Sequence, residues 1–230
     1  MAKRVKKVKT SKKFTIVREH LLTVPVSEKN PTGQTLRDTH PRRIKGTYLD
    51  TSETKSIFKN YDRSEIIYPT SKKLLKEYRD SDNYDDLIAV WSDYFKKKFK
   101  SENPIDPDVV KALIASESSF KADPKRNRII ARGLTQITKS THKILQDPQG
   151  ESREFIFKNI LQRDLADPNI SIPMAIRWLY RKQQTAASKL KRVPTHEDII
   201  LEYKGLLKSN SAYKQKGLSK YRQAYDKLKK

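Results

Sequence analysis

Apolar residues recur three and four positions apart through most of the chain after about residue 66, a spacing typical of amphipathic helices. The segment before that point lacks this periodicity. The pattern predicts helices over about 71–78, 84–99, 107–120, 138–146, 153–161, 168–190, 195–207 and 219–229. The sequence therefore predicts an all-α domain over residues 66–230.

Local start signals support several of these helices. The Asp-Pro pairs at 106–107 and 167–168 place Asp at the N-cap and Pro at the first helical position, where each is favoured. Thr195 is followed three residues later by Asp198, which is a capping-box pattern. The beginnings of these three helices are thus better defined than their ends.

Residues 1–65 differ in character from the rest. Residues 1–13 contain seven basic side chains and no acidic one. Residues 15–17 and 21–26 have β-type composition, and residues 30–33 (Asn-Pro-Thr-Gly) are typical of a turn. We expect an irregular basic N-terminal arm with about two short strands; a partly ordered leader is the alternative.

Charge indicates the kind of partner. Fifty Lys and Arg against 27 Asp and Glu give a net charge of +23, which attracts polyanions. Nucleic acid, teichoic acid, lipopolysaccharide phosphate and the carboxylates of peptidoglycan stem peptides all remain open on charge alone. The chain has no cysteine, which excludes disulfides, a thiol nucleophile and a cysteine-based zinc site.

Other classes of site and segment find little support. The four histidines have no paired-ligand spacing, and six glycines form no phosphate loop, so we expect no metal and no cofactor. We expect no transmembrane segment. The stretch 14–26 is interrupted by charged residues, and no Sec-type signal is expected there.

One carboxylate stands out within the predicted helix 107–120. Glu117 lies four residues after Leu113 and three after Ile114, on the same face as the apolar stripe. A desolvated carboxyl there is suited to be a general acid, because burial disfavours its charged form. The alternative is a Glu at the edge of the stripe that reaches solvent or a Lys.

Four segments together resemble a known family. They are residues 115–122 (ASESSFKA), 133–137 (GLTQI), 167–179 (DPNI to WL) and 202–205 (EYKG). In this order and spacing they are similar to the lytic transglycosylase domain of the soluble type (SLT), in glycoside hydrolase family 23. The resemblance covers about residues 105–207. It implies a lysozyme-like helical fold related to goose-type lysozyme.

The resemblance also implies a function and a set of site residues. The substrate would be peptidoglycan glycan strands, cleaved between N-acetylmuramic acid and N-acetylglucosamine to leave 1,6-anhydro ends. Glu117 would be the one catalytic acid and base. Ser118 and Gln136 would bind substrate, and the Tyr203 hydroxyl would orient Glu117. The place of action would be the cell wall or periplasm. Without a Sec-type signal, it would be reached by phage lysis, dedicated secretion or a virion, and the positive charge adds anionic envelope polymers as expected partners.

The distribution of carboxylates favours the intramolecular route over hydrolysis. Hydrolytic glycosidases usually carry a second carboxylate about 5–9.5 Å from the acid. No Asp or Glu occurs between Asp123 and Asp147, and Asp123 beside Pro124 is typical of a turn. A hydrolytic muramidase of the same fold remains the nearest alternative.

Departures from the family pattern keep other interpretations open. Thr135, Lys139, Glu202 and Lys204 replace residues usual in the family. The last segment is therefore the weakest, and Tyr203 at a helical apolar position could belong to the core. The further alternatives are a cell-wall-binding module without catalysis and a basic nucleic-acid-binding protein. No sequence-specific nucleic-acid module is evident.

Overall fold

A computed structural model describes residues 14–17, 20–23, 31–32, 34–37, 40–43, 47–71, 77–124 and 131–230. The chain divides into two compact units, residues 1–46 and 47–230. The second unit thus begins at Thr47, earlier than the boundary at 65/66 that periodicity indicated. The reason is that strand β5 (Thr47–Leu49) and helix α1 (Thr51–Lys59) belong to it.

The described residues of the first unit form two antiparallel strand pairs. Strand β1 (Phe14–Val17) pairs with β4 (His40–Arg43), and β2 (His20–Thr23) pairs with β3 (Gln34–Arg37). The strands expected near 15–17 and 21–26 correspond to β1 and β2. Their partners were not anticipated, because the sequences QTLR and HPRR lack an alternating apolar pattern.

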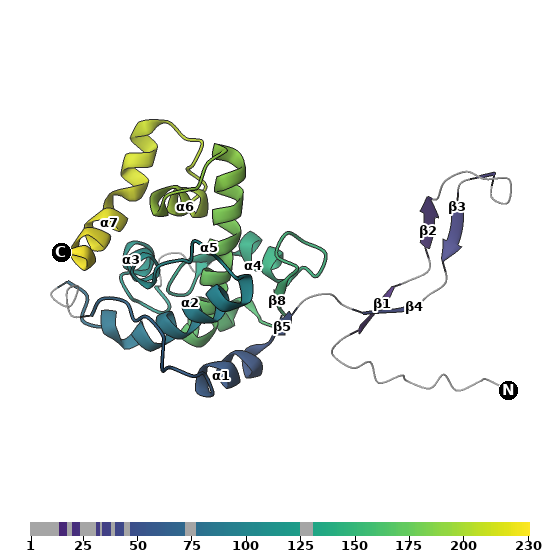
Figure 1. Ribbon diagram of the computed structural model, residues 1–230, viewed down its shortest axis with the longest axis horizontal. Coiled ribbons are helices and arrows are strands. Elements are labelled where there is room, and N and C mark those ends of the chain that lie inside the picture. Colours follow the sequence, from purple (N-terminus) through teal and green to yellow (C-terminus); the bar gives the residue numbers. More distant parts are fainter. Residues whose placement is uncertain are drawn as a thin grey trace. The chain divides into compact units, whose positions relative to one another are not determined.

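The second unit is mainly helical, which confirms the all-α prediction (Figure 1). Among its described residues, short 3₁₀ helices occur at η1 (Ser81–Tyr84) and η3 (Gln162–Ala166). After α1 its helices are α2 (Asp85–Phe99), α3 (Pro107–Ser118), α4 (Lys139–Gln146), α5 (Pro168–Leu190), α6 (His196–Tyr203) and α7 (Ser211–Lys229).

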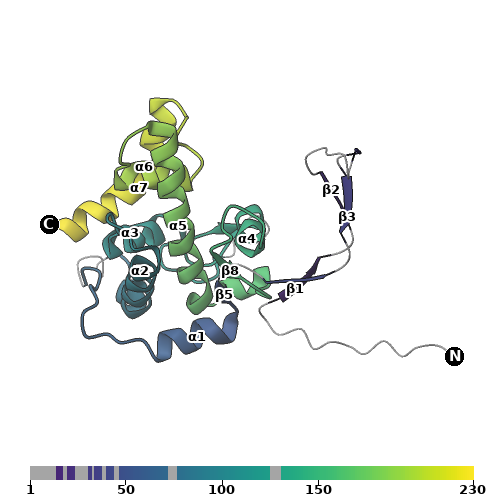
Figure 2. The same cartoon turned by 45° about the vertical axis from the view of Figure 1, so that its right-hand side comes forward.

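Helix α5 is the central element of this unit. Asp167 caps it by accepting a hydrogen bond from the Asn169 backbone, as the Asp-Pro signal predicted. It packs against α2 and α1 in its first half and against α6 in its second half, and both views show α6 beside its upper end (Figures 1 and 2). Fully buried members of the resulting core include Trp91, Phe95, Leu113, Ile114, Leu179 and Tyr221.

Helix α7 packs along α3. It begins at Ser211, earlier than the expected start near 219, because Asn210 caps it through a hydrogen bond from the Tyr213 backbone. At its other end Lys229 Nζ lies 2.8 Å from a carboxylate oxygen of Asp106 and 2.8 Å from one of Asp108. These two carboxylates are at the beginning of α3, so the end of the chain is tied to it.

The prediction of a helix over 153–161 is wrong. Residues Phe155–Phe157 form strand β8, which pairs in parallel with β5, and the neighbouring residues form turns. All three β8 residues are buried, and short apolar runs of this kind do not distinguish strand from helix. The helix expected over 71–78 falls largely on 72–76, which lie outside the described residues.

The remaining predicted helices agree with α2 to α6 to within a few residues at their ends. Thr195 and Asp198 form the expected capping box at the start of α6. In the part of the chain that the structure describes, every helix is too short or too polar to cross a membrane.

Candidate active site

Glu117 lies in the last turn of α3, which ends abruptly after Ser118. Ser119 and Phe120 have φ angles of 52° and 63°, in the left-handed region that stops a helix. Phe120 is almost fully buried and its ring lies 6.3 Å from the Tyr84 ring in a stacked arrangement. The phenylalanine of the Glu-Ser-x-Phe segment therefore anchors the chain where it leaves the helix and holds Glu117 at the helix end.

The Glu117 side chain is half-buried and paired. Its relative exposure is 19%, between a core position and a free surface carboxylate. Glu117 Oε1 accepts a hydrogen bond from the Lys204 ammonium, and these two groups form an ion pair. Lys204 Nζ also lies 3.4 Å from Ser116 Oγ. The alternative in which Glu117 reaches a Lys thus describes this contact, whereas the sequence marked Lys204 itself only as a departure from the family pattern.

The end of α6 holds Lys204 in place. Gly205 has a φ of 72°, and its backbone N–H donates to Glu202 O at 3.2 Å. The Leu206 N–H donates to Leu201 O at 2.7 Å. Together these bonds form a Schellman ending, which fixes the backbone of the capping residue Lys204. The glycine in the EYKG segment thus has a conformational role.

Tyr203 connects α6 to the segment 133–136. Its hydroxyl donates to the Thr135 carbonyl oxygen at 2.8 Å, so its single hydrogen is not directed at Glu117 as the resemblance implied. Burial raises the pKa of Tyr203, and the negative charge of Glu117 raises it further. The tyrosine is therefore close to Glu117, but Lys204 makes the direct contact.

The segment 133–136 is a tight turn between strands β6 (Ala131–Arg132) and β7 (Ile137–Thr138). Gly133 has a φ of 78°, and a Cβ at this position would lie 2.3 Å from Leu165 O and 2.7 Å from Ser171 Cβ. Only glycine fits both the conformation and the space. The turn is thereby pressed against η3 and α5.

The two expected substrate-binding residues differ in their surroundings. Gln136 is partly buried with a φ of 52°, and its side-chain amide donates to Gly133 O at 2.9 Å. Its carbonyl oxygen is a further hydrogen-bonding group of the same side chain. Ser118 is buried, and its hydroxyl donates to Ile114 O at 3.3 Å within the helix. Substrate contact by either residue stays a prediction.

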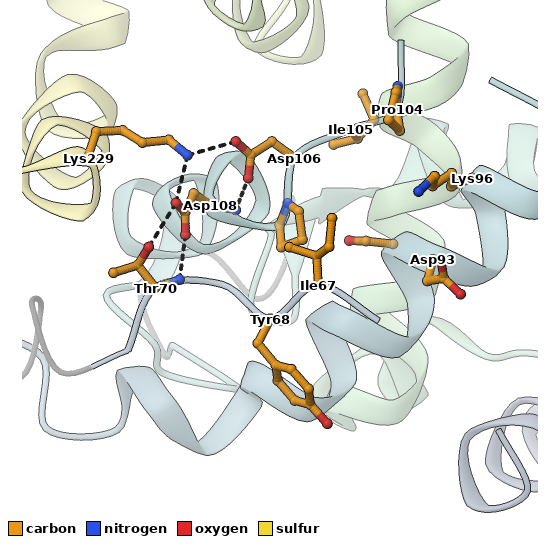
Figure 3. A pocket seen from close by; sticks show the side chains of 12 residues that line it. Ile67, Tyr68, Thr70, Asp93, Lys96, Pro104, Ile105, Asp106, Asp108 and Lys229 are labelled. Atoms are coloured by element: carbon orange, nitrogen blue, oxygen red, sulfur yellow. Dashed lines mark hydrogen bonds and ion pairs between the residues drawn. The ribbon is translucent and has the colours of Figure 1, made fainter. Parts of the chain in front are cut away.

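A pocket of about 420 Å³ lies at the other end of α3 (Figure 3). Its polar wall includes Asp108, which accepts hydrogen bonds from Thr70 and pairs with Lys229. About 13 Å of helix separates Asp108 from Glu117, at 1.5 Å per residue. The pocket therefore does not belong to the Glu117 site. Among the described residues, no three His, Asp or Glu side chains come together as metal ligands.

Comparison of the sequence with models of known families identifies the family of this domain. The model of the transglycosylase SLT domain matches residues 93–216, more than half of the chain. The chain belongs to the transglycosylase SLT domain family. The match runs from the second half of α2 into α7 and includes both ends of the Glu117–Lys204 pair. A search of curated proteins finds no match.

Membership in the SLT family confirms the resemblance and the lysozyme-like helical fold. It indicates a peptidoglycan-acting enzyme of transglycosylase or lysozyme-like activity, with the cell wall as its place of action. Within this SLT domain, three elements meet at one place: the end of α3 with Glu117, the turn at 133–136, and the end of α6. Lys204 belongs to that group through its contact with Glu117, which the sequence alone did not indicate.

Proposed function

We propose that the protein is a peptidoglycan lytic transglycosylase in which Glu117 is the single catalytic acid and base. The observation that carries the proposal is the half-buried position of Glu117 at the end of α3, beside the turn and helix end that contain the other SLT segments. A carboxyl group there is partly shielded from bulk water and is still exposed enough to reach a glycan.

The chemistry needs no second carboxylate. Protonated Glu117 gives its proton to the glycosidic oxygen as the bond from that oxygen to the muramyl anomeric carbon breaks. The resulting carboxylate then takes the proton from the muramyl C6 hydroxyl, whose oxygen bonds to the same anomeric carbon. Glu117 ends protonated, no water is consumed, and the product has a 1,6-anhydro end. The internal hydroxyl has a high effective concentration.

The supporting residues have narrower proposed roles. Gln136 has a side-chain carbonyl oxygen available for a sugar hydroxyl or acetamido N–H, since its amide already donates to Gly133. Ser118 helps to position substrate, and Tyr203 holds the turn against α6 so that Gln136 stays near Glu117. Removing the Tyr203 hydroxyl would loosen this turn.

The test is digestion of purified sacculi with mass analysis of the muropeptides. We expect products that lack one water relative to reducing-end muropeptides. Glu117→Gln, which keeps the shape of the side chain, should lower the rate by about a thousandfold or more, with little change in melting temperature. Reducing ends instead of anhydro ends would establish a hydrolytic muramidase, and an active Glu117→Gln variant would refute the assignment of Glu117.

Charge supports a further proposal about where the enzyme concentrates. The net charge is +23, and the exposed lysines Lys216 and Lys220 lie one turn apart on α7. We propose that anionic envelope polymers attract the enzyme without sequence- or structure-specific recognition. Binding to teichoic acid or lipopolysaccharide should then fall steeply with added salt, whereas salt-resistant binding would indicate a specific site.

A further inference from the structure

The Glu117–Lys204 pair presents a physical difficulty for the proposed function, on which the following inference rests. A general acid must carry a proton, but Glu117 accepts a hydrogen bond from an ammonium group. An adjacent positive charge favours the carboxylate form of a carboxyl group. The same ammonium would also repel the positive charge that develops on the sugar as the glycosidic bond breaks. In the arrangement described, Lys204 opposes the first chemical step.

Protonating Glu117 without any other change would leave Lys204 in an unfavourable state. Its side chain is only 16% exposed. Among the described residues, the ammonium contacts one polar group besides Glu117, and this is the uncharged hydroxyl of Ser116. A largely buried cation without a counter-charge is costly. Protonation of Glu117 is therefore linked to the arrival of another anion at Lys204, or to movement of Lys204 toward one.

The fold allows this movement. The Schellman ending fixes the Lys204 backbone, but the side chain has a flexible four-carbon stem. The neighbouring cations on α5 have a different carboxylate partner: Lys189 Nζ is 2.6 Å from Glu202 and Lys182 Nζ is 3.8 Å from it. Lys204 alone of these three pairs with Glu117 in the described part of the chain.

We propose that Lys204 is a specificity-determining residue that couples activation of Glu117 to a carboxylate on the glycan. In the free enzyme Lys204 holds Glu117 as a paired carboxylate. A substrate carboxylate next to the scissile bond takes over the ammonium, and Glu117 becomes free to bind a proton. The chemical class of the recognised group is a carboxylate, which the substrate presents on the muramyl lactyl group or on the stem peptide.

The central experiment compares two forms of the same polymer. One is unmodified peptidoglycan, and the other has its carboxylates converted to methylamides with a carbodiimide, which removes the charge and keeps the glycan. We expect wild-type kcat/KM to fall about tenfold or more on the amidated polymer. Assays at about 0.5 M salt, where the Debye length is about 4 Å, suppress the general attraction of a basic protein to an anionic polymer.

Substitution of Lys204 separates this coupling from a structural role. Lys204→Met should lose most of the discrimination between the two polymers, and Lys204→Arg should retain it. Lys189→Met is the matched control, because it removes one lysine from a nearby Lys–Glu pair that does not include Glu117. It should discriminate as the wild type does. Melting temperatures of all three variants report whether the fold is intact.

The pH profile supplies a second readout. Without the ammonium, a carboxyl group at 117 binds a proton more readily, so the alkaline limb of kcat/KM should move to higher pH in Lys204→Met. Lys189→Met should leave the limb in place. A merely structural role for Lys204 would lower activity at every pH without moving the limb.

Two forms of the glycan identify the source of the carboxylate. Strands stripped of stem peptides by an amidase present the lactyl carboxylate alone, and intact strands present only stem carboxylates. Discrimination that occurs only with intact strands assigns the stem peptide, and discrimination that occurs only with stripped strands assigns the lactyl group.

The inference would be overturned if Lys204→Met distinguishes the two polymers as well as the wild type does and keeps the alkaline limb of kcat/KM at the same pH. This holds even if Glu117→Gln is inactive. Activity in Glu117→Gln would instead overturn the proposed function itself.

Discussion

The two ends of helix α3 carry buried charge in different ways. Toward its beginning, Lys111 is fully buried, and its ammonium contacts Asp82 at 2.6 Å, Asp85 at 2.8 Å and the Thr70 carbonyl at 3.0 Å. At the other end, Glu117 retains partial exposure and its described ion-pair partner is Lys204, a flexible side chain. A saturated, enclosed charge stabilises the fold, whereas a half-open pair can be exchanged during a reaction.

Removing one charge from each end of α3 tests this difference most directly. Lys111→Met removes the ammonium that contacts both Asp82 and Asp85. We expect the free energy of unfolding to fall by about 3–5 kcal/mol, the usual cost of removing one partner from a buried pair. Urea denaturation measures this change.

Substitutions at Glu117 and Lys111 should affect different properties, namely activity and stability. Glu117→Gln should be inactive and stable, whereas Lys111→Met should be unstable and, below its melting temperature, active. Equal stability of Lys111→Met and the wild type would mean that the buried network contributes nothing to the fold.

A smaller effect is expected at the turn 133–136, which faces the Glu117 end of α3. Gly133→Ala introduces a Cβ that meets the Leu165 carbonyl and Ser171, at a residue whose φ is 78°. Strain and crowding together should lower the free energy of unfolding by about 2–4 kcal/mol. Because Gln136 belongs to the same turn, kcat/KM should fall as well.

Gly205→Ala is the control for Gly133→Ala. Gly205 also has a left-handed φ, but a Cβ there would meet no atom within 4 Å. The expected loss is therefore only about 1 kcal/mol, from backbone conformation alone. A loss equal to that of Gly133→Ala would show that crowding against Leu165 is unimportant.

The smallest expected effect is the pH dependence that Asp85 adds to stability. Burial raises the pKa of Asp85 to about 6 from 3.8, although hydrogen bonding to Lys111 opposes the shift. Between about pH 4 and 6 the folded state therefore binds more protons at this site than the unfolded state. The free energy of unfolding therefore rises as pH falls through 6. Above pH 6 the buried, ionised Asp85 lowers the free energy of unfolding by its full amount.

Asp85→Asn should remove this contribution, so the difference in unfolding free energy between wild type and variant should change with pH. We expect a change of about 1 kcal/mol between pH 7 and 5, since solvent reduces the effect at a partly accessible carboxyl. Denaturation at several pH values measures it. A difference that is constant across this range would contradict the assigned titration.

Elements with local signals could be predicted from the sequence. The Asp-Pro pairs and the capping box located the starts of α3, α5 and α6, because N-cap chemistry involves residues only two or three positions apart. The position of Glu117 relative to Leu113 and Ile114 placed it on the buried side of one helix. Its selection as the candidate acid also needed the resemblance of four segments to the SLT family.

Features that depend on distant residues were missed. Strand β8 exists because β5 pairs with it, and nothing within the sequence FIF distinguishes that outcome from a helix. The contact between Lys204 and Glu117 joins residues 87 positions apart. The acceptor of the Tyr203 hydroxyl is likewise set by how α6 meets the turn at 133–136.

The parallel pairing of β5 with β8 has a practical consequence for expressing the enzyme. A recombinant fragment trimmed to the SLT match, residues 93–216, would lose β5 and leave β8 with exposed main-chain donors and acceptors. It would also lose the buried Leu49 at one end and Tyr221 and Leu228 at the other. A shortened protein that retains solubility and folding should extend from Thr47 to Lys230.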